Sequence, residues 1–367
     1  MARLVLHIGT HKTGTTAIQG TLDCNRSLLR RNDVIYPSFP AAQLRGLSAV
    51  KRLWRNGRNC LAQTGMLSPV LGPSIGHHGL LSPWVELPED LMAAAPSETL
   101  LDNLSRAHAD SSRTVLLSSE EFSRSHAGRN GKGPDLAKIR DMIAAFSEIR
   151  IVCFLRHQIP FLQSLYLEVA KATVPPRPAL LSHQAIKSGY GAGMFMDFNL
   201  LLDRLTAAFP SDRLVFIDYA QAAQSRQGVT GALLAAAGHG SLAAKLRQPS
   251  NGQANVSPPS LAIWAANQIA EPKIPAANLL NIAKHTLQDH YGPEPATTIF
   301  SRAERSSMAA HFEPLNRSFE TRVATAHPSA ATPFQLSDPA AHELVHREDL
   351  APAFWDELTR AIRQQTP

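Results

Sequence analysis

Short runs rich in apolar residues recur along the chain, and polar or charged residues follow each of them. They cover residues 4–8, 34–36, 113–119, 150–155 and 213–218. Continuous apolar runs of this length are typical of strands that a parallel sheet buries on both faces. We therefore predict a strand at each of these positions.

Segments with a helical pattern alternate with these strands. They cover residues 15–31, 135–147, 160–172 and 198–209. Pro160 fits the first turn of the third helix, and the fourth has an amphipathic pattern. Strands that alternate with helices predict an α/β fold of three layers, with a central parallel sheet flanked by helices.

Two regions depart from this alternation. Residues about 37–110 contain many Pro, Gly and Ser residues, and we interpret them as an insertion that is either a wall of a binding pocket or a surface excursion. Residues about 258–324 are mostly helical, although Pro314 should break or kink a helix over 303–323. We predict a single domain over 1–367 with this insertion and this helical C-terminal elaboration.

The segment between the first strand and the first helix has the composition of a phosphate-binding loop. Residues 9–16 read GTHKTGTT. A glycine-bearing turn exposes backbone N–H groups, and the helix N-terminus behind it adds partial positive charge. A turn that only joins a buried strand to a helix would have a similar pattern.

The position of the lysine separates two classes of phosphate loop. A nucleoside-triphosphatase loop has its lysine directly after the second glycine. Here Thr15 follows Gly14, and Lys12 comes two residues before that glycine. The HKTGTT arrangement resembles the 5′-phosphosulfate loop of sulfotransferases that use 3′-phosphoadenosine 5′-phosphosulfate (PAPS). The resemblance implies a P-loop-type fold, PAPS as co-substrate and no metal, and it assigns cofactor binding to His11, Lys12, Thr13, Gly14, Thr15 and Thr16.

A second anion-binding pair lies far along the sequence. Arg156 directly follows the strand over 150–155, and Ser164 lies eight residues later on the next predicted helix. Open α/β sheets bind ligands at the carboxyl ends of their strands, where Arg156 would lie. The pair resembles the sulfotransferase segment that binds the 3′-phosphate of PAPS. Taken alone, an arginine at a strand end is more often a salt-bridge or surface residue.

Two carboxylates follow the strand over 113–119. Glu120 and Glu121 come directly after Ser118-Ser119. Sulfuryl transfer to a hydroxyl or amine needs a base that takes the proton of the acceptor. Adjacent residues of a strand face opposite ways, so at most one of the two glutamates should face the ligand. We predict that Glu120 is the base, with Glu121 as the second choice. Either carboxylate could instead complement the N-terminus of a following helix.

The resemblance implies a role for each of these residues. Lys12 would neutralise charge on the leaving phosphate oxygen, Glu120 would accept the proton, and Arg156 with Ser164 would fix the cofactor. Many sulfotransferases have a tryptophan after the double threonine, where this chain has Ala17. A C-terminal glycine-rich loop of the family has at best a functional equivalent in residues 247–257. The residues that contact adenine therefore stay unassigned.

Composition and charge agree with an enzyme for an anionic co-substrate. The 367 residues carry a net charge of +6, but no basic run interleaved with aromatic residues indicates nucleic acid. Three unpaired cysteines indicate a reducing compartment. The His77-His78 pair has no partner at metal-ligand spacing, so we predict no metal site.

We expect a cytoplasmic protein. The first apolar run leads into His11 and Lys12 and is too short for a signal peptide, and no later run could span a bilayer. Contact with the membrane would be peripheral, at its inner face.

The sequence as a whole resembles sulfotransferases of the bacterial, glycan-modifying kind. Its acceptor would be a carbohydrate, glycoconjugate or other small molecule with a hydroxyl or amine group, and no motif identifies it. The alternative is a nucleotide-binding P-loop protein, either an atypical kinase or a module without catalysis. A kinase should have an acidic magnesium site at a strand end, which Ser118-Ser119-Glu120 weakly imitates.

Overall fold

The computed structural model describes most of the chain. The described residues are 2–39, 76–87, 91–125, 133–249, 258–326, 334–336 and 343–365. The chain forms two compact units, each with its own hydrophobic core. The first consists of Met1–Arg156, Gly193–Ala254 and Ser318–Ser337, and the second of His157–Ala192, Asn255–Arg317 and Asp338–Pro367.

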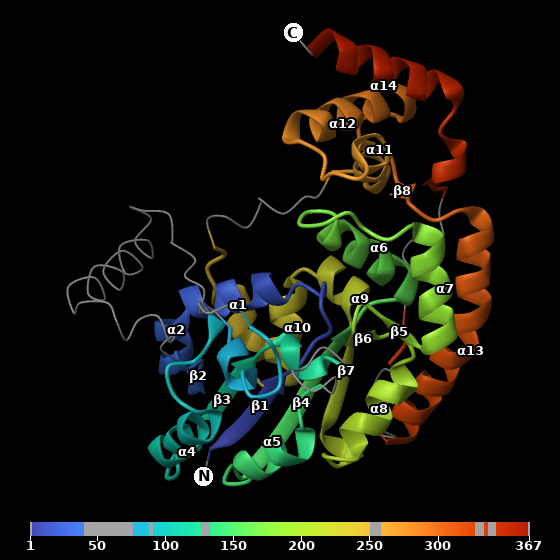
Figure 1. The fold of residues 1–367 in the computed structure, drawn as a ribbon. Coiled ribbons are helices and arrows are strands. Elements are labelled where there is room, and N and C mark those ends of the chain that lie inside the picture. Colours follow the sequence, from blue (N-terminus) through green and yellow to red (C-terminus); the bar gives the residue numbers. More distant parts are fainter. Residues whose placement is uncertain are drawn as a thin grey trace. The chain divides into compact units, whose positions relative to one another are not determined.

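A five-stranded parallel sheet forms the centre of the first unit (Figure 1). Its strands are β1 (Arg3–His7), β2 (Val34–Ile35), β3 (Thr114–Ser118), β4 (Glu148–Leu155) and β7 (Leu214–Asp218), in the order β2-β3-β1-β4-β7. Leu6 of β1 is opposite Leu117 on one side and Ile151 on the other. All five predicted strands are confirmed. Runs that are apolar on both faces are typical of strands that helices cover on both sides of a sheet.

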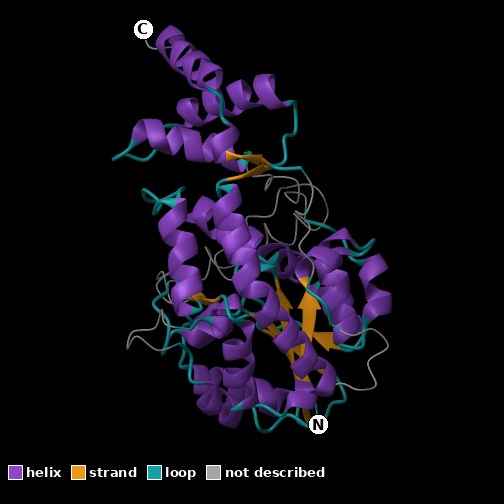
Figure 2. Ribbon diagram, turned by 90° about the vertical axis from the view of Figure 1, so that its right-hand side faces the viewer, coloured by secondary structure: helices purple, strands orange, loops and turns teal. Residues whose placement is uncertain are grey.

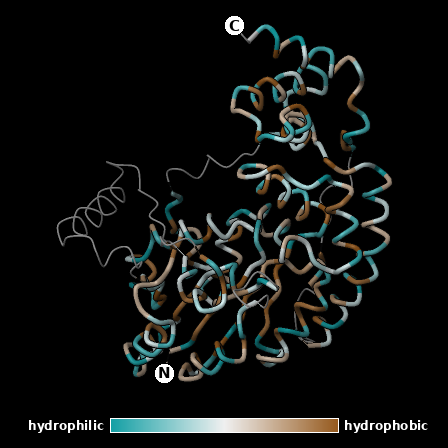
Figure 3. Tube along the Cα trace, in the orientation of Figure 1, coloured by the Kyte–Doolittle hydropathy of each residue, from teal (hydrophilic) through white to brown (hydrophobic). Residues whose placement is uncertain are grey.

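Helices cover this sheet, which confirms the predicted α/β class. The helices of the first unit are α1 (Thr15–Cys24), α2 (Arg26–Arg31), α4 (Ser97–Ala107), α5 (Leu136–Met142), α8 (Phe198–Thr206), α9 (Tyr219–Gln224) and α10 (Gly228–Ala236). On one face, Ile18 and Leu22 of α1 and Leu233 of α10 share a core with Val5 and Val152 of the sheet. In Figure 3, hydrophobic stretches of the chain run through the interior of this unit.

The helix predicted over 15–31 is interrupted at Asn25. The side chain of Asn25 donates to the carbonyl of Thr21 at 2.7 Å and to that of Arg247 at 2.8 Å, and it accepts the N–H of Arg247 at 3.0 Å. Asparagine competes with helical backbone bonds in this way. The helix predicted over 135–147 is also shorter, since α5 ends at Met142.

The second unit is mostly helical, as predicted for the region after residue 258 (Figure 2). It contains α6 (Gln158–Val169), α7 (Pro178–Ser188), α11 (Ser260–Ala270), α12 (Ala277–Tyr291) and α14 (Pro352–Gln365), and β8 (Thr297–Thr298) pairs with β9 (Val345–His346). Helix α13 (Arg302–Ala326) contains Pro314 in its interior, so the proline does not end the helix. Among the described residues, no helix has the length and apolar character needed to cross a membrane.

Part of the predicted insertion belongs to the first unit. Its described residues include the 3-10 helix η2 (His78–Leu81) and α4. His77 and Ser118 exchange hydrogen bonds at 2.9 Å, because each donates its backbone N–H to the other residue. The segment before η2 is therefore attached to the end of β3. Residues 40–75 and 88–90 of the insertion lie outside the described residues.

Candidate functional site

The loop between β1 and α1 begins on the central strands and ends in left-handed backbone. The N–H groups of Ile8 and Thr10 donate to the carbonyls of Val152 and Phe154 at 2.9 and 3.0 Å. Lys12 has φ 63° and Gly14 has φ 76°. A lysine in the left-handed region is uncommon, and such strain is found most often at functional sites.

Gly9 allows the loop to pass close to the strand. A Cβ atom on Gly9 would lie 2.8 Å from Nε2 of His7, 3.0 Å from Oγ1 of Thr13 and 3.4 Å from Cβ of Phe154. The first distance is shorter than side-chain atoms tolerate. The hydroxyl of Thr13 donates to the carbonyl of Thr10, which closes the turn. Any side chain at the first glycine of the motif would therefore clash with its neighbours.

The N-terminus of α1 has no side-chain cap. Gly14 is its N-cap residue, and the first helical bond runs from the N–H of Ile18 to the carbonyl of Gly14. The preceding N–H groups of the first turn have no intrahelical partner and carry partial positive charge, which suits an anion. Thr15 is buried, whereas Thr16 is exposed.

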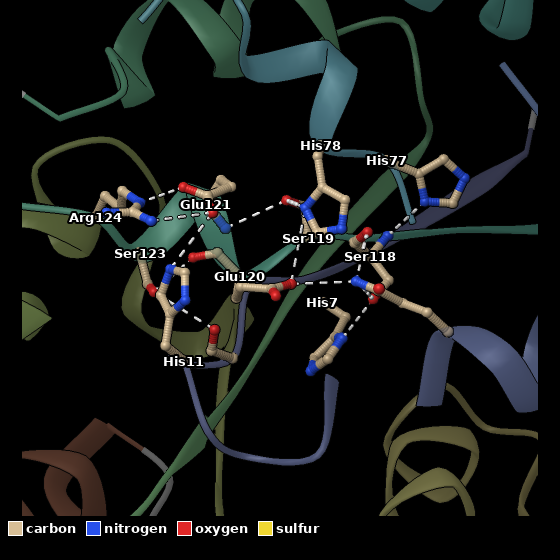
Figure 4. Close-up of polar contacts among 12 residues, drawn as sticks. His7, His11, His77, His78, Ser118, Ser119, Glu120, Glu121, Ser123 and Arg124 are labelled. Atoms are coloured by element: carbon tan, nitrogen blue, oxygen red, sulfur yellow. Dashed lines mark hydrogen bonds and ion pairs between the residues drawn. The ribbon is translucent and has the colours of Figure 1, made fainter. Parts of the chain in front are cut away.

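The two glutamates after β3 have different surroundings. They begin the 3-10 helix η4 (Glu120–Ser123), and Oγ of Ser119 accepts the N–H of Glu121 at 3.2 Å. Glu121 is buried, is paired with Arg124, and has Oε1 3.6 Å from Nε2 of His11 (Figure 4). Both glutamates lie in the first turn of η4, so the predicted alternative of a carboxylate at a helix N-terminus applies to each of them.

Glu120 is half-buried and contacts residues from two other elements. Its Oε2 accepts a hydrogen bond from Nε2 of Gln19 at 3.2 Å and lies 3.8 Å from Nδ1 of His78 (Figure 4). Within the described residues its Oε1 accepts no hydrogen bond. The two oxygens of this carboxylate therefore differ in their surroundings.

Four histidines surround these strand ends: His7, His11, His77 and His78 (Figure 4). Burial lowers the pKa of His7 to about 4, against the charge of Glu120, and lowers the pKa of His77 to about 3. Burial also lowers the pKa of His11 to about 4, although Glu121 raises it. At neutral pH these three rings are uncharged. The predicted cation of the loop is therefore Lys12.

The sequence did not indicate that His7, His77 and His78 lie at this site. His7 ends β1, and its Nδ1 lies 2.8 Å from Oγ of Ser118. His77 and His78 contact Ser118 and Ser119 across 41 residues. The dipeptide itself was the only signal in the sequence. Within the described residues, no group of His, Cys, Asp and Glu residues is arranged to hold a metal ion.

Arg156 lies beside the loop. Its Nη1 donates to the carbonyl of Lys12 at 3.4 Å, and its guanidinium lies 5.4 Å from the centre of the Tyr219 ring. Burial lowers the pKa of Arg156, and Tyr219 raises it. Tyr219, the first residue of α9, would also lie 3.4 Å from a Cβ atom on Gly14. Ser164 belongs to the second unit, where it is buried on α6 and donates to the carbonyl of Phe161 at 2.9 Å.

The candidate equivalent of the C-terminal loop lies partly against α1. Besides the Arg247 bonds to Asn25, Oγ1 of Thr21 lies 3.4 Å from Oε1 of Gln248. Residues 250–257 lie outside the described residues. Ala17 is exposed on the first turn of α1.

Comparisons with known proteins give distant structural likenesses and no sequence match. The chain matches no protein-family profile and no curated protein sequence. A solved sulfotransferase from Alicyclobacillus acidocaldarius is similar in structure, with 13% identity and a TM-score of 0.41, over 87% of this chain and 94% of that chain. A likeness of this degree carries no assignment of function, which has to come from the site.

Proposed function

We propose that this protein is a PAPS-dependent sulfotransferase that transfers a sulfuryl group to a hydroxyl or amine acceptor. The observation that supports this most is the loop over residues 9–16. It lies at the carboxyl end of the central strand β1, its lysine precedes its second glycine, and the helix behind it has no side-chain cap. This arrangement suits a phosphosulfate without a bound magnesium ion.

The residues of the loop fit an anion of this kind. The N–H groups of the first turn of α1 and the hydroxyls of Thr15 and Thr16 would bind the 5′-phosphate. His11 and Thr13 would complete the cradle, with Thr13 also holding the turn through the carbonyl of Thr10. Lys12 would supply the positive charge, because His11 is neutral.

Arg156 and Ser164 would bind the 3′-phosphate, which distinguishes PAPS from ATP. The contact of Arg156 with the carbonyl of Lys12 supports the first of these roles, since it places the guanidinium beside the loop. The ring of Tyr219 also lies beside that guanidinium. The role of Ser164 follows from the sequence resemblance alone.

Glu120 would be the general base. PAPS supplies the sulfuryl group, which moves in line to the acceptor oxygen as its bond to the phosphate oxygen breaks. Glu120 would take the proton of the acceptor, and Lys12 would stabilise the charge that develops on the leaving oxygen. The pairing of Glu121 with Arg124 supports Glu120 over Glu121, since an ion-paired buried carboxylate is a poorer proton acceptor.

The acceptor would be a carbohydrate, a glycoconjugate or another small molecule. We propose that the enzyme acts in the cytoplasm, with peripheral contact at the inner membrane face where the acceptor is an envelope glycan precursor. The net charge of +6 agrees with an anionic co-substrate and with an acidic acceptor or lipid surface.

Calorimetric titration tests the co-substrate. We expect 3′-phosphoadenosine 5′-phosphate (PAP) to bind without metal and more tightly than ATP with magnesium. A preference for ATP with magnesium would contradict the proposal and favour a kinase-type protein.

Two substitutions test the assigned roles with labelled PAPS and a panel of acceptors. Lys12→Ala should abolish sulfuryl transfer, because the charge on the leaving oxygen is no longer neutralised. Glu120→Gln should reduce transfer by about 100-fold or more while the affinity for PAP is kept. Transfer by Glu120→Gln at the native rate would show that another residue is the base.

A further inference from the structure

The segment from Gly76 to Leu81 brings a histidine from the insertion to the carboxylate of Glu120. His77 is attached to β3 through two hydrogen bonds with Ser118. Because its Nδ1 accepts the N–H of Ser118, the ring proton lies on Nε2, which donates to the carbonyl of Pro37 at 3.0 Å. The position of the next residue, His78, is therefore fixed by the strand end.

Two side chains lie close to Oε2 of Glu120: Gln19 from α1 and His78 from η2. Nδ1 of His78 lies 2.9 Å from Oγ of Ser119 and 3.8 Å from Oε2 of Glu120, and Gln19 donates to Oε2 at 3.2 Å. Gln19 is buried on α1, and its amide also donates to Ser118 at 3.4 Å. In Figure 4, a dashed line joins the carboxylate of Glu120 to the ring of His78.

Gly76 permits this arrangement by its lack of a side chain. A Cβ atom on Gly76 would lie 2.6 Å from Nε2 of His78, 2.7 Å from Cδ of Gln19 and 2.8 Å from Nε2 of Gln19. The backbone at Gly76 therefore lies directly against both side chains. No substituent fits there unless one of them moves.

We propose that Gln19 and His78 are positioning residues that hold Oε2 of Glu120 and present Oε1 to the acceptor. This inference rests on the proposed function and extends it, because it gives part of the insertion a place in catalysis. A base that can rotate freely meets the acceptor proton only part of the time, and misplacement by about 1 Å can cost about 100-fold in rate. Neither residue accepts the proton itself.

Steady-state kinetics with PAPS separates positioning from a structural role. Gln19→Ala and His78→Ala should lower kcat by about 10- to 100-fold. Both should leave the PAP dissociation constant within about twofold. His78→Asn, which places a side-chain amide near the position of Nδ1, should recover most of kcat. His108→Ala is the matched control, because its ring lies at the C-terminal end of α4 away from Glu120.

A second pair of variants changes the space and leaves both side chains in place. Gly76→Ala should lower kcat as His78→Ala does. Gly20→Ala should not, because its Cβ atom would lie 3.5 Å from Cγ of Pro249, which is ordinary contact. A native kcat in His78→Ala or Gly76→Ala would overturn the inference while the proposed function stood.

A measurement without turnover separates the two failures. The imidazole resonances of His78 should shift in Glu120→Gln, and those of His108 should not. If PAP does not bind and no sulfuryl is transferred, the proposed function fails, and this shift still reports the contact. Unchanged His78 resonances would overturn the inference whatever the protein binds.

Discussion

Acid should destabilise the first unit well above the pH at which most carboxylates titrate. His7 and His77 are 0% and 2% exposed, and burial lowers their pKa values to about 4 and about 3. In the unfolded chain each ring returns to its ordinary value of 6.5. Between those values the unfolded chain binds protons that the folded chain does not, so the free energy of unfolding falls as pH falls.

The size of the effect follows from the two depressed pKa values. Between about pH 7 and pH 5, each of the two histidines should remove about 2 kcal/mol from the free energy of unfolding. Together they remove about 4 kcal/mol, a large share of a typical stability of about 5–15 kcal/mol. His11 should add to this loss, since burial lowers its pKa to about 4 as well.

Urea unfolding at about pH 7, 6 and 5 gives the free energy of unfolding, and hydrogen exchange of the β1 and β3 amides reports on the first unit alone. His77→Asn cannot be protonated in this range, so it should reduce the pH slope by about one proton. His183→Asn, an exposed histidine of the second unit, is the control. A change below about 1 kcal/mol between pH 7 and 5, or an unaltered slope in His77→Asn, would contradict this prediction.

Two further changes test the packing of the loop and the partly buried ion pair of Glu121 with Arg124. Gly9→Ala should lower the free energy of unfolding by about 1–3 kcal/mol in urea and weaken PAP binding in calorimetry, because its Cβ atom would clash with His7 and Thr13. Native values for both quantities would show that the loop relaxes freely. Arg124→Met should lower the free energy of unfolding by about 3 kcal/mol, since it leaves the buried Glu121 without its arginine partner. Arg106→Met breaks an exposed pair with Asp102 and should cost under about 1 kcal/mol. Equal losses in the two variants would contradict this difference.

The sequence was sufficient to predict the sheet and the position of the loop. Both depend on local signals, because a run that is apolar on both faces has few places other than a parallel sheet. Helix ends were harder to predict. Asn25 interrupts the helix through bonds to Arg247, which is 222 residues away, and no local pattern indicates such a partner.

The surroundings of the predicted base could not be read from the sequence for a similar reason. Glu120 was predicted from its strand end, but Gln19 reaches it from 101 residues earlier in the sequence, and His78 reaches it from the insertion. Gly76 and Gly9 are ordinary glycines in the sequence. Their importance depends on which atoms a Cβ would meet, and that is known only once the elements are packed.

The strand order has a consequence for synthesis on the ribosome. β1 is made first, but its two neighbours are β3, which begins at Thr114, and β4, which ends at Leu155. At about 5–20 residues per second, β1 waits on the order of ten seconds before either neighbour emerges. During that time its edges are unpaired, so a nascent chain that ends before β4 exposes an apolar strand that chaperones can bind.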